Sequence, residues 1–462
     1  MRALSNGLLV AVVVFCVVVG GWLQSAVGSP NIVLVLVDDL GYGDLGSYGC
    51  ADIETPNLDR LADSGVRLTR GYVSAPYCGP SRAGFMTGRY QQRHGFWRNP
   101  SNWPVDVLQG LDLGEETLGD LLRRAGYRTA VIGKWHLGAA EAHHPVNRGF
   151  DEFFGFLGGG HEYFPARYER TLRKWSADHS DGQTPFLYNY ATPLQINGVE
   201  LPPRDGYLTD ILTEYAIGFM RRASGMGRPF FIYLPYNAPH VPLEAPDELL
   251  EKYAHIGDGR RRPYAAMVDS LDRNIGRMLD HLEASGERGD TLIVFASDNG
   301  GKAANGGDNG ALRGHKGLVY EGGVRVPFLF SWPDGLPAGA TFELPVTTLD
   351  LLPTFAAAAG VEPLGEPLDG VNVLPWLRGE AAGRPHQRLF WERAQQRAML
   401  EGDWKLVRRA ENSSWELFDL SVDVGEANDL AAEHPQRVEA MKQRYAEWFD
   451  AMPPARWEDP QY

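Results

Sequence analysis

The chain has 462 residues, which is enough for one large domain and a smaller second one. Its hydrophobic content of 44% and its charged content of 22% are ordinary for a folded globular protein. The formal net charge of −15 argues against nucleic acid as a partner, because binding to phosphates needs a basic surface, and it requires any basic substrate site to be local.

An apolar run near the start of the chain predicts an export signal. Residues 8–22 are continuously apolar, Arg2 precedes them, and small residues follow at 25–29. This layout is typical of a cleaved secretory signal. The alternative is an uncleaved membrane anchor, but the run is short for a membrane span. We therefore expect residues 1–28 to be a signal peptide, the mature chain to be periplasmic or secreted, and no stable membrane insertion after cleavage.

Two cysteines remain beyond that segment, Cys50 and Cys78. An exported chain with only two cysteines is not a disulfide scaffold. The two could still pair with each other, but the residues that surround Cys78 favour a different role for it.

Five apolar runs predict the strands of a largely parallel sheet. The first, Asn31–Val37, is rich in β-branched residues, as expected for a central strand that is buried on both faces. Similar runs recur at Arg128–Ile132, Pro229–Pro235, Thr291–Ser297 and Arg325–Ser331. Helical patterns such as Thr55–Ser64 and Arg262–Ser285 lie between them. Strands that alternate with helices predict an α/β sandwich.

A smaller second unit is predicted toward the end of the chain. Residues 379–385 form a connector rich in Gly, Ala, Arg and Pro. Short strand-like segments follow at Arg397–Leu400, Trp404–Arg408 and Trp415–Asp419, and an amphipathic helix at about Pro435–Asp450. We expect a catalytic domain over residues 29–380 and a small α+β subdomain with an antiparallel sheet over residues 381–462.

Two acidic clusters follow predicted strands at the same relative position. Asp38-Asp39 comes directly after Asn31–Val37, and Asp298-Asn299 comes directly after Thr291–Ser297. In open parallel sheets, binding sites form outside the carboxyl ends of the strands. Three carboxylates and an amide oxygen suit Ca²⁺ or Mg²⁺ rather than zinc. A helix cap or an Asx turn would explain either pair alone, whereas the two pairs together favour a metal site.

The run Cys78-Gly79-Pro80-Ser81-Arg82 predicts a nucleophile at the start of a helix. Pro80 suits the first residue of a short helix, which places Cys78 just before the N-terminus. There the helix dipole and free backbone N–H groups favour an anion, and Arg82 adds a full positive charge. A nucleophile that attacks an anionic ester needs this environment, whereas a structural cysteine does not.

The stretch from Cys78 to Arg89 resembles the signature of the formylglycine-dependent sulfatases, C-x-P-S-R followed by a T-G-R ending. Other segments match that family in the same order, at residues 38–39, 133–138, 237–240, 297–300 and 314–327. The resemblance covers nearly the whole chain beyond the signal and points to the arylsulfatase A and N-acetylgalactosamine-6-sulfatase branch. It implies an alkaline-phosphatase-like sandwich and a sulfated sugar or an aryl sulfate as the substrate.

The resemblance also implies a modified residue and one calcium ion. A formylglycine-generating enzyme would oxidise Cys78 to formylglycine (3-oxoalanine), whose hydrate presents one hydroxyl to the ion and attacks the sulfur of the ester. Asp38, Asp39, Asp298 and Asn299 would hold the Ca²⁺ together with the modified Cys78.

The charge-offsetting and proton-transferring residues follow from the same resemblance. Arg82, Lys134 and Lys316 would offset the charge on the sulfate oxygens. His240 would protonate the leaving alcohol, and His136 would take the proton of the second hydroxyl so that sulfate is expelled. Lys134 and His136 would lie on one face of an extended segment.

One departure from the family concerns substrate contacts. Where some members place a serine followed by a histidine, this chain has Gly158-Gly159-Gly160-His161, so His161 alone remains a candidate substrate-binding residue. A basic cluster farther on could contact an acidic sugar chain, although a solvated helix face is the preferred interpretation; it comprises Arg167, Arg170, Arg173 and Lys174.

Two other functions remain open at this point. The first is a phosphonate or phosphodiester hydrolase of the same superfamily, which would cleave phosphate esters faster than sulfate esters. The second is a non-catalytic glycan-binding protein in which Cys78 stays unmodified.

Overall fold

The computed structural model describes residues 29–167 and 192–458. The expected signal peptide lies outside these ranges, as do Arg170, Arg173 and Lys174 of the basic cluster. Within the two described ranges, no helix is both long enough and apolar enough to cross a membrane.

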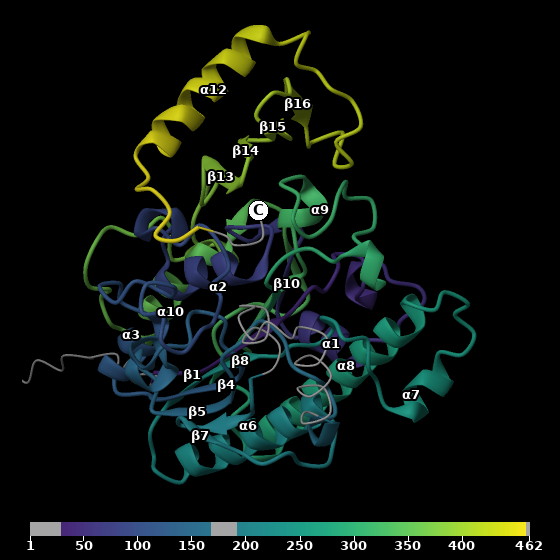
Figure 1. Cartoon of the computed structure of the whole chain (residues 1–462), viewed down its shortest axis with the longest axis vertical. Helices are drawn as coiled ribbons and strands as arrows, with labels where there is room; N and C mark the ends of the chain where they lie inside the picture. Colours follow the sequence, from purple (N-terminus) through teal and green to yellow (C-terminus); the bar gives the residue numbers. More distant parts are fainter. Residues whose placement is uncertain (1–28, 168–191, 459–462) are drawn as a thin grey trace, which may run out of the picture.

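A ten-stranded sheet runs through the larger part of the molecule, in the order β11-β2-β10-β9-β1-β8-β4-β5-β6-β7 (Figure 1). Its parallel centre consists of β9 (Thr291–Ser297), β1 (Asn31–Val37), β8 (Phe230–Pro235), β4 (Arg128–Lys134) and β5 (Glu152–Phe156). Antiparallel neighbours continue it on both sides, namely β10 (Phe328–Ser331) and β2 (Val66–Leu68) on one side and β6 (Gln195–Ile196) and β7 (Val199–Glu200) on the other. The edge strand β11 (Ala340–Phe342) pairs in parallel with β2. The predicted mostly parallel sheet is therefore confirmed.

Alternate strand residues point to opposite faces of the sheet, and because the residues on both faces are apolar, helices cover each face. In β1, the side chains of Val33, Val35 and Val37 belong to one core, and those of Ile32, Leu34 and Leu36 belong to the other. The first core includes α1 (Pro56–Asp63), α6 (Leu208–Ser224), α7 (Asp247–Lys252) and α8 (Arg261–Ala284). The second includes α2 (Cys78–Thr87), α3 (Leu118–Arg124), α10 (Leu351–Ala359) and α11 (Leu374–Leu377). A strand sandwiched in this way has to be apolar on both faces, as the sequence of β1 is.

A four-stranded antiparallel sheet forms the smaller unit above the main body in Figure 1. Its strands are β13 (Arg388–Arg393), β14 (Gln396–Glu401), β15 (Trp404–Arg408) and β16 (Trp415–Asp419). Helix α12 (Pro435–Asp450) packs on one face of this sheet, and the other face contacts β3 (Gly71–Tyr72) and α9 (Glu321–Val324). The second unit with its antiparallel sheet and closing helix is confirmed, but the sequence analysis missed β13.

The chain returns to the larger domain after α12. The indole of Trp97 donates to the carbonyl of Pro453 at 3.0 Å, and the indole of Trp457 donates to the carbonyl of Asn99 at 3.2 Å. The side chain of Asn99 in turn accepts a hydrogen bond from the backbone of Gly79 in α2 at 2.9 Å. The C-terminal segment therefore supports the loop that lies beside the start of α2.

Candidate active site

Neighbouring parallel strands deliver polar side chains to one edge of the sheet. Asp38 and Asp298 follow β1 and β9, and the backbone N–H of Asp298 donates to the carbonyl of Val37 at 2.9 Å. His240 lies in the loop after β8, and Lys134 is the last residue of β4. The strand-end argument made from the sequence correctly placed the two acidic clusters side by side.

Helix α2 begins at Cys78 rather than at Pro80, two residues earlier than predicted. Tyr77 is the extended residue that precedes the helix, and Pro80 occupies the third helical position. A proline is tolerated there because the first four N–H groups of a helix have no partner within the helix. Cys78 is therefore within the first turn, and its side chain is 4% exposed.

Arg82 is fully buried and its guanidinium is held on several sides. Nε and Nη2 donate to Oδ2 of Asp298 at 3.0 and 2.8 Å. Nη1 donates to the hydroxyl of Tyr233 at 3.1 Å and to the carbonyl of Lys134 at 3.3 Å. The helix that carries Cys78 is thereby bonded to the residue after β9, to the last residue of β4 and to Tyr233 within β8.

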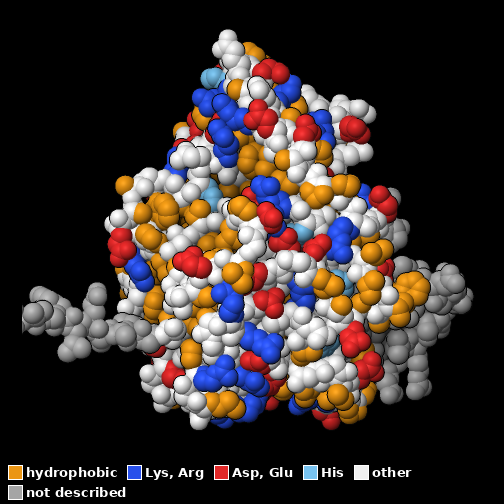
Figure 2. Space-filling model, turned by 90° about the vertical axis from the view of Figure 1, so that its left-hand side faces the viewer, with side chains coloured by type: hydrophobic (Ala, Val, Ile, Leu, Met, Phe, Trp, Pro, Cys, Tyr) orange, Lys and Arg blue, Asp and Glu red, His pale blue; other side chains and the backbone are white. Residues whose placement is uncertain are grey.

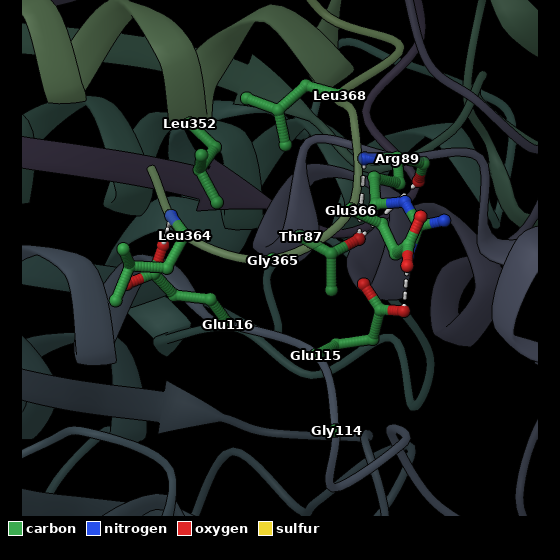
Figure 3. A pocket seen from close by; sticks show the side chains of 10 residues that line it. All are labelled: Thr87, Arg89, Gly114, Glu115, Glu116, Leu352, Leu364, Gly365, Glu366 and Leu368. Atoms are coloured by element: carbon green, nitrogen blue, oxygen red, sulfur yellow. Dashed lines mark hydrogen bonds and ion pairs between the residues drawn. The ribbon is translucent and has the colours of Figure 1, made fainter. Parts of the chain in front are cut away.

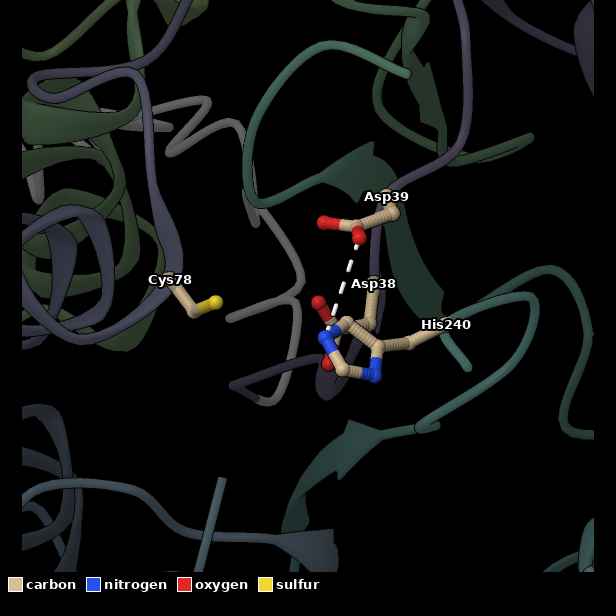
Figure 4. A group of neighbouring side chains, drawn as sticks. All are labelled: Asp38, Asp39, Cys78 and His240. Carbon is tan, nitrogen blue, oxygen red and sulfur yellow. Dashed lines mark ion pairs between the residues drawn. The ribbon is translucent and has the colours of Figure 1, made fainter. Parts of the chain in front are cut away.

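Asp38, Asp39, Cys78 and His240 each offer a ligand atom, and these four atoms all lie within 4.8 Å of one another. Figure 4 shows the sulfur of Cys78 facing the carboxylate of Asp38 and the imidazole of His240. The four residues come from the segment directly after β1, from α2 and from the loop after β8, and all four are buried. This group is a candidate centre for a cation next to the proposed nucleophile.

The oxygen atoms around this group fit a hard cation. Three of the buried oxygens that surround it have no hydrogen-bond partner in the described structure, namely Oδ1 of Asp38, Oδ2 of Asp39 and Oδ1 of Asn299. Burying a carboxylate oxygen without a partner costs free energy, and a divalent cation removes that cost. Ca²⁺ and Mg²⁺ prefer this kind of donor.

The predicted ligands are not equally available for a metal. Asp298 already accepts two bonds from Arg82 on Oδ2, and its Oδ1 lies 3.4 Å from the backbone N of Asp39. Asn299 donates its amide to Oδ1 of Asp39 at 2.7 Å, which leaves its carbonyl oxygen for the ion. His240, which was expected only to transfer a proton, lies with Nε2 3.7 Å from Oδ2 of Asp39.

Two lysines pair with the same carboxylates. Nζ of Lys134 lies 2.5 Å from Oδ2 of Asp38, and Nζ of Lys316 lies 2.6 Å from Oδ1 of Asp39. Burial alone would raise the pKa of Asp38, but the positive charge of Lys134, with His240 and Arg82, holds that pKa well below its usual range. The site therefore brings anion-binding and cation-binding groups together, which is what an anionic ester bound beside a metal requires.

His136 lies beyond the end of β4 and has a φ of +60°. The expected extended segment therefore ends before it, and the prediction that it shares an extended face with Lys134 was wrong. Burial, followed by the charges of Lys134 and Arg82, lowers the pKa of His136 well below its usual value. This shift favours the neutral imidazole over its protonated form.

His161 is buried in the segment next to the His240 loop. Its Nδ1 lies 2.8 Å from the carbonyl oxygen of Glu162, and its own carbonyl accepts a bond from the side chain of Asn237 at 3.3 Å. The pKa of His161 is lowered to about 4, chiefly by burial. The structure thus places this candidate beside the loop that carries His240, and it is uncharged.

The residues that support the backbone of Asp39 were not predicted from the sequence. The buried Asp44 accepts a hydrogen bond from the hydroxyl of Tyr264 at 2.6 Å and from the backbone of Gly41 at 2.9 Å. The same hydroxyl lies 3.3 Å from the carbonyl oxygen of Asp39. A side chain at Gly41 would meet the carbonyl oxygen of Asp308 at 2.0 Å, so the Gly-rich turn after the acid pair was the available signal.

A separate pocket of about 190 Å³ opens near the other end of α2 (Figure 3). Thr87, Leu352 and Leu368 contribute to its wall, and Arg89 pairs with Glu115 across it. The length of α2 at about 1.5 Å per residue separates this pocket from Cys78 by roughly 14 Å. The pocket therefore does not belong to the group around Cys78.

Comparisons with known proteins found a family model and several relatives that match most of the chain. Residues 30–361 match the family model described as Sulfatase, and residues 314–449 match that described as N-sulphoglucosamine sulphohydrolase, C-terminal. The chain is 34% identical to N-acetylgalactosamine-6-sulfatase of Sus scrofa over 85% of this chain and 74% of that protein. It is 36% identical to arylsulfatase A of Bos taurus over 79% of this chain and 71% of that protein. The solved structure of Ps i-CgsB in complex with k-i-k-neocarrahexaose superposes with a TM-score of 0.86 at 39% identity, covering 93% of this chain and 94% of that one.

Proposed function

Because the chain belongs to the sulfatase family of sulfuric ester hydrolases, we propose that it removes sulfate from a sulfated glycan with formylglycine at position 78 and one calcium ion. The observation that carries this proposal is the close group of Asp38, Asp39, Cys78 and His240, with Lys134 and Lys316 paired to its carboxylates. Acidic ligands for a cation and lysines for an anion meet at the residue that would be modified.

We assign the calcium ligands among the buried oxygens around Cys78. Asp38, Asp39 and Asn299 each supply a buried oxygen that has no hydrogen-bond partner in the described structure, and Asp298 lies beside them through its contact with the backbone N–H of Asp39. When bound, the ion would lower the pKa of a hydroxyl on the modified residue 78 and so provide a nucleophile at neutral pH. Of the two histidines that we assign to proton transfer, His240 is the one whose Nε2 lies within 4 Å of these carboxylates, at 3.7 Å from Oδ2 of Asp39.

The other site residues bind the sulfate group and move protons. The ammonium groups of Lys134 and Lys316, which pair with Asp38 and Asp39, would also attract the oxygens of an anionic ester. The guanidinium of Arg82 is held by Asp298 and adds a further positive charge to the site. His136 is neutral and is assigned to accept a proton. Nδ1 of His240 lies 2.8 Å from the carbonyl of Val241 and donates to it, so its Nε2 is the atom that would protonate the leaving alcohol once it carries a proton.

The proposed substrate is a sulfated sugar, in agreement with the names of the relatives. One related structure is described in complex with k-i-k-neocarrahexaose, and a related enzyme is named N-acetylgalactosamine-6-sulfatase. We further propose that the protein acts after export, because polysaccharides of this kind are extracellular and residues 1–28 have the layout of a secretory signal.

Two measurements on the protein from its native host test the function. The peptide that contains Cys78 should have the mass of formylglycine, and the protein should release inorganic sulfate from 4-nitrophenyl sulfate. Cys78→Ala should reduce turnover by at least about 1,000-fold, because the nucleophile is lost, while the cooperative unfolding transition remains.

The competing functions predict different results. An unmodified thiol in an inactive protein would support a glycan-binding function instead. Faster cleavage of bis-(4-nitrophenyl) phosphate than of 4-nitrophenyl sulfate would support a phosphodiester hydrolase.

A further inference from the structure

The turn between β13 and β14 reaches from the C-terminal subdomain to the two segments that carry Cys78 and Lys316. Arg393 is the last residue of β13, and its Nη1 donates to the carbonyl of Gly317 at 2.7 Å. Its guanidinium carbon lies 5.3 Å from the centroid of the Tyr77 ring. Because Tyr77 precedes Cys78 and Gly317 follows Lys316, Arg393 contacts the neighbours of two residues that we assign to the active site.

The position of this guanidinium is defined by its surroundings. Gln396, across the same turn, donates to the same Gly317 carbonyl at 2.9 Å and accepts from the backbone of Val319 at 3.3 Å. Gly317 has a φ of +87°, and a side chain there would meet Nη1 of Arg393 at 3.1 Å. The cation is therefore held in place before any ligand binds, which lowers the entropic cost of binding.

The side chains of Arg393 and Tyr77 are partly exposed, in contrast to the catalytic cations. Arg82 and Lys134 are 0% exposed and face the carboxylates around Cys78. Arg393 and Tyr77 are instead of intermediate exposure, although Tyr77 directly precedes the buried Cys78. The chain carries a net charge of −15, and acidic and basic side chains are interspersed over the face shown in Figure 2. The positive charge of Arg393 is therefore a local feature of the region around Tyr77 and not part of a generally basic surface.

The chemistry of the pair suits a charged sugar. A tyrosine ring offers an apolar face against which the C–H groups of a sugar ring can pack. A guanidinium matches the oxygens of a sulfate group through two parallel hydrogen bonds. The pair lies next to the proposed nucleophile in the chain, because Tyr77 directly precedes Cys78.

We propose that Tyr77 and Arg393 form a subsite that binds a second sulfate group on the glycan, next to the sulfate that is removed. This inference rests on the proposed function and specifies its substrate as a polysulfated glycan. It also gives the C-terminal subdomain a direct part in substrate recognition, since Arg393 belongs to β13.

Equilibrium binding tests the subsite without turnover. In the Cys78→Ala background, calorimetry measures the affinity for neocarrahexaose, which carries several sulfates, and for 4-nitrophenyl sulfate, which carries one. Arg393→Ala should weaken hexasaccharide binding by about 10- to 100-fold, the usual worth of a charge-assisted pair, and should change 4-nitrophenyl sulfate binding less than twofold.

Two control variants separate recognition from loop support. Gln396→Ala removes the other donor to Gly317 without a change of charge, so it tests the support of the loop alone and should change the affinity for either ligand less than twofold. Arg388→Ala removes a cation from the exposed part of the same strand, where it pairs with Glu401, and should affect neither ligand.

Three outcomes would overturn the proposal. They are equal losses for the two ligands in Arg393→Ala, an unchanged hexasaccharide affinity in that variant, and hexasaccharide binding no tighter than that of 4-nitrophenyl sulfate in the parent. Sulfate release by the protein with Cys78 intact is measured separately, so a failure of the sulfatase function is visible independently of the subsite.

Discussion

Asp39 and His136 both have left-handed backbone conformations, with φ of +66° and +60°. Residues other than glycine rarely adopt this region, at a cost of about 1–3 kcal/mol each. Three contacts hold Asp39 in this conformation. The hydroxyl of Tyr264 lies near the carbonyl oxygen of Asp39, and the Asp39 carboxylate accepts a hydrogen bond from Asn299 and pairs with Lys316. The backbone strain thus lies at the residues to which we assign metal binding and proton transfer.

Calcium should stabilise the folded protein through Asp39. Removing divalent cations with EGTA should lower the melting temperature by several degrees, and Ca²⁺ at 100-fold above its Kd should restore about 3 kcal/mol. In Asp39→Asn this dependence should be lost, because a buried carboxylate ligand becomes neutral. Scanning calorimetry with and without Ca²⁺ measures the difference.

Asp280→Asn is a suitable control for the calcium measurement, since Asp280 is exposed and pairs only with Arg60 on the surface in the described structure. It should keep the full calcium response. A melting temperature that does not respond to Ca²⁺ in the unchanged protein would contradict the assigned ligands.

At the scale of single residues, the sequence predicted which groups gather but not how they pair. The rule that sites lie at the ends of parallel strands brought Asp38 and Asp298 together correctly. The sequence analysis assigned Arg82 to the sulfate oxygens, yet its guanidinium is bound to Asp298, which is 216 residues away in the sequence. A contact between such distant residues leaves no local pattern.

The strand β4 places Lys134 at the site through close contact with β8. Gly133 has a φ of +131°, and a side chain there would lie 2.1 Å from the carbonyl oxygen of Pro235. The residue just before Lys134 therefore has to be glycine for the two strands to approach this closely. Here the packing of two elements determines the position of a functional side chain.

Gly133→Ala should destabilise the protein by about 3 kcal/mol or more, because the strands must separate and the backbone is strained. Sulfate release should fall as well, because Lys134 is displaced. Urea unfolding and turnover of 4-nitrophenyl sulfate provide the two measurements.

Gly218→Ala provides the matched control in helix α6. The nearest atom to a side chain there is the flexible Nη1 of Arg222 at 3.4 Å, so alanine should stabilise the helix by about 0.5–1 kcal/mol. Equal effects of the two substitutions would show that the contact between β4 and β8 is not the cause.

The elements with regular hydrophobic patterns were predicted well. The helix expected at Arg262–Ser285 spans Arg261–Ala284, and the strand expected at Asn31–Val37 has these bounds. Strand β13 was missed because it begins only three residues after the Gly-, Ala-, Arg- and Pro-containing connector and has an arginine as its first and its last residue. Its position depends on packing against Tyr72 and Val73, which are more than 300 residues earlier in the chain.

At the scale of the whole molecule, a buried charge network joins the two units. Nζ of Lys405, in β15, lies 2.7 Å from Oε1 of Glu321 in α9 and 3.1 Å from Oε1 of Glu426. The backbone of Glu321 also donates to Oε2 of Glu426 at 2.8 Å. All three side chains are 0% exposed, so the network is sensitive to the loss of any member.

Lys405→Met should destabilise the protein by about 3–5 kcal/mol, because it leaves two buried carboxylates without their shared cation. Lys442→Met, which removes a partly exposed lysine paired with Glu439 on α12, should change stability by less than about 1 kcal/mol. Chemical denaturation of both variants gives the comparison, and similar small losses in both would mean that the network does not stabilise the junction.

The burial of Cys78 has a consequence for the timing of biosynthesis. A maturation enzyme cannot reach a side chain that is 4% exposed within α2, so under the proposed function Cys78 has to be oxidised before the domain closes. Trp457 completes the support of the neighbouring loop through Asn99. Roughly 380 residues separate it from Cys78, which corresponds to about 20–75 seconds of translation at 5–20 residues per second. The fraction of active protein is then set by competition between oxidation and folding of the nascent chain.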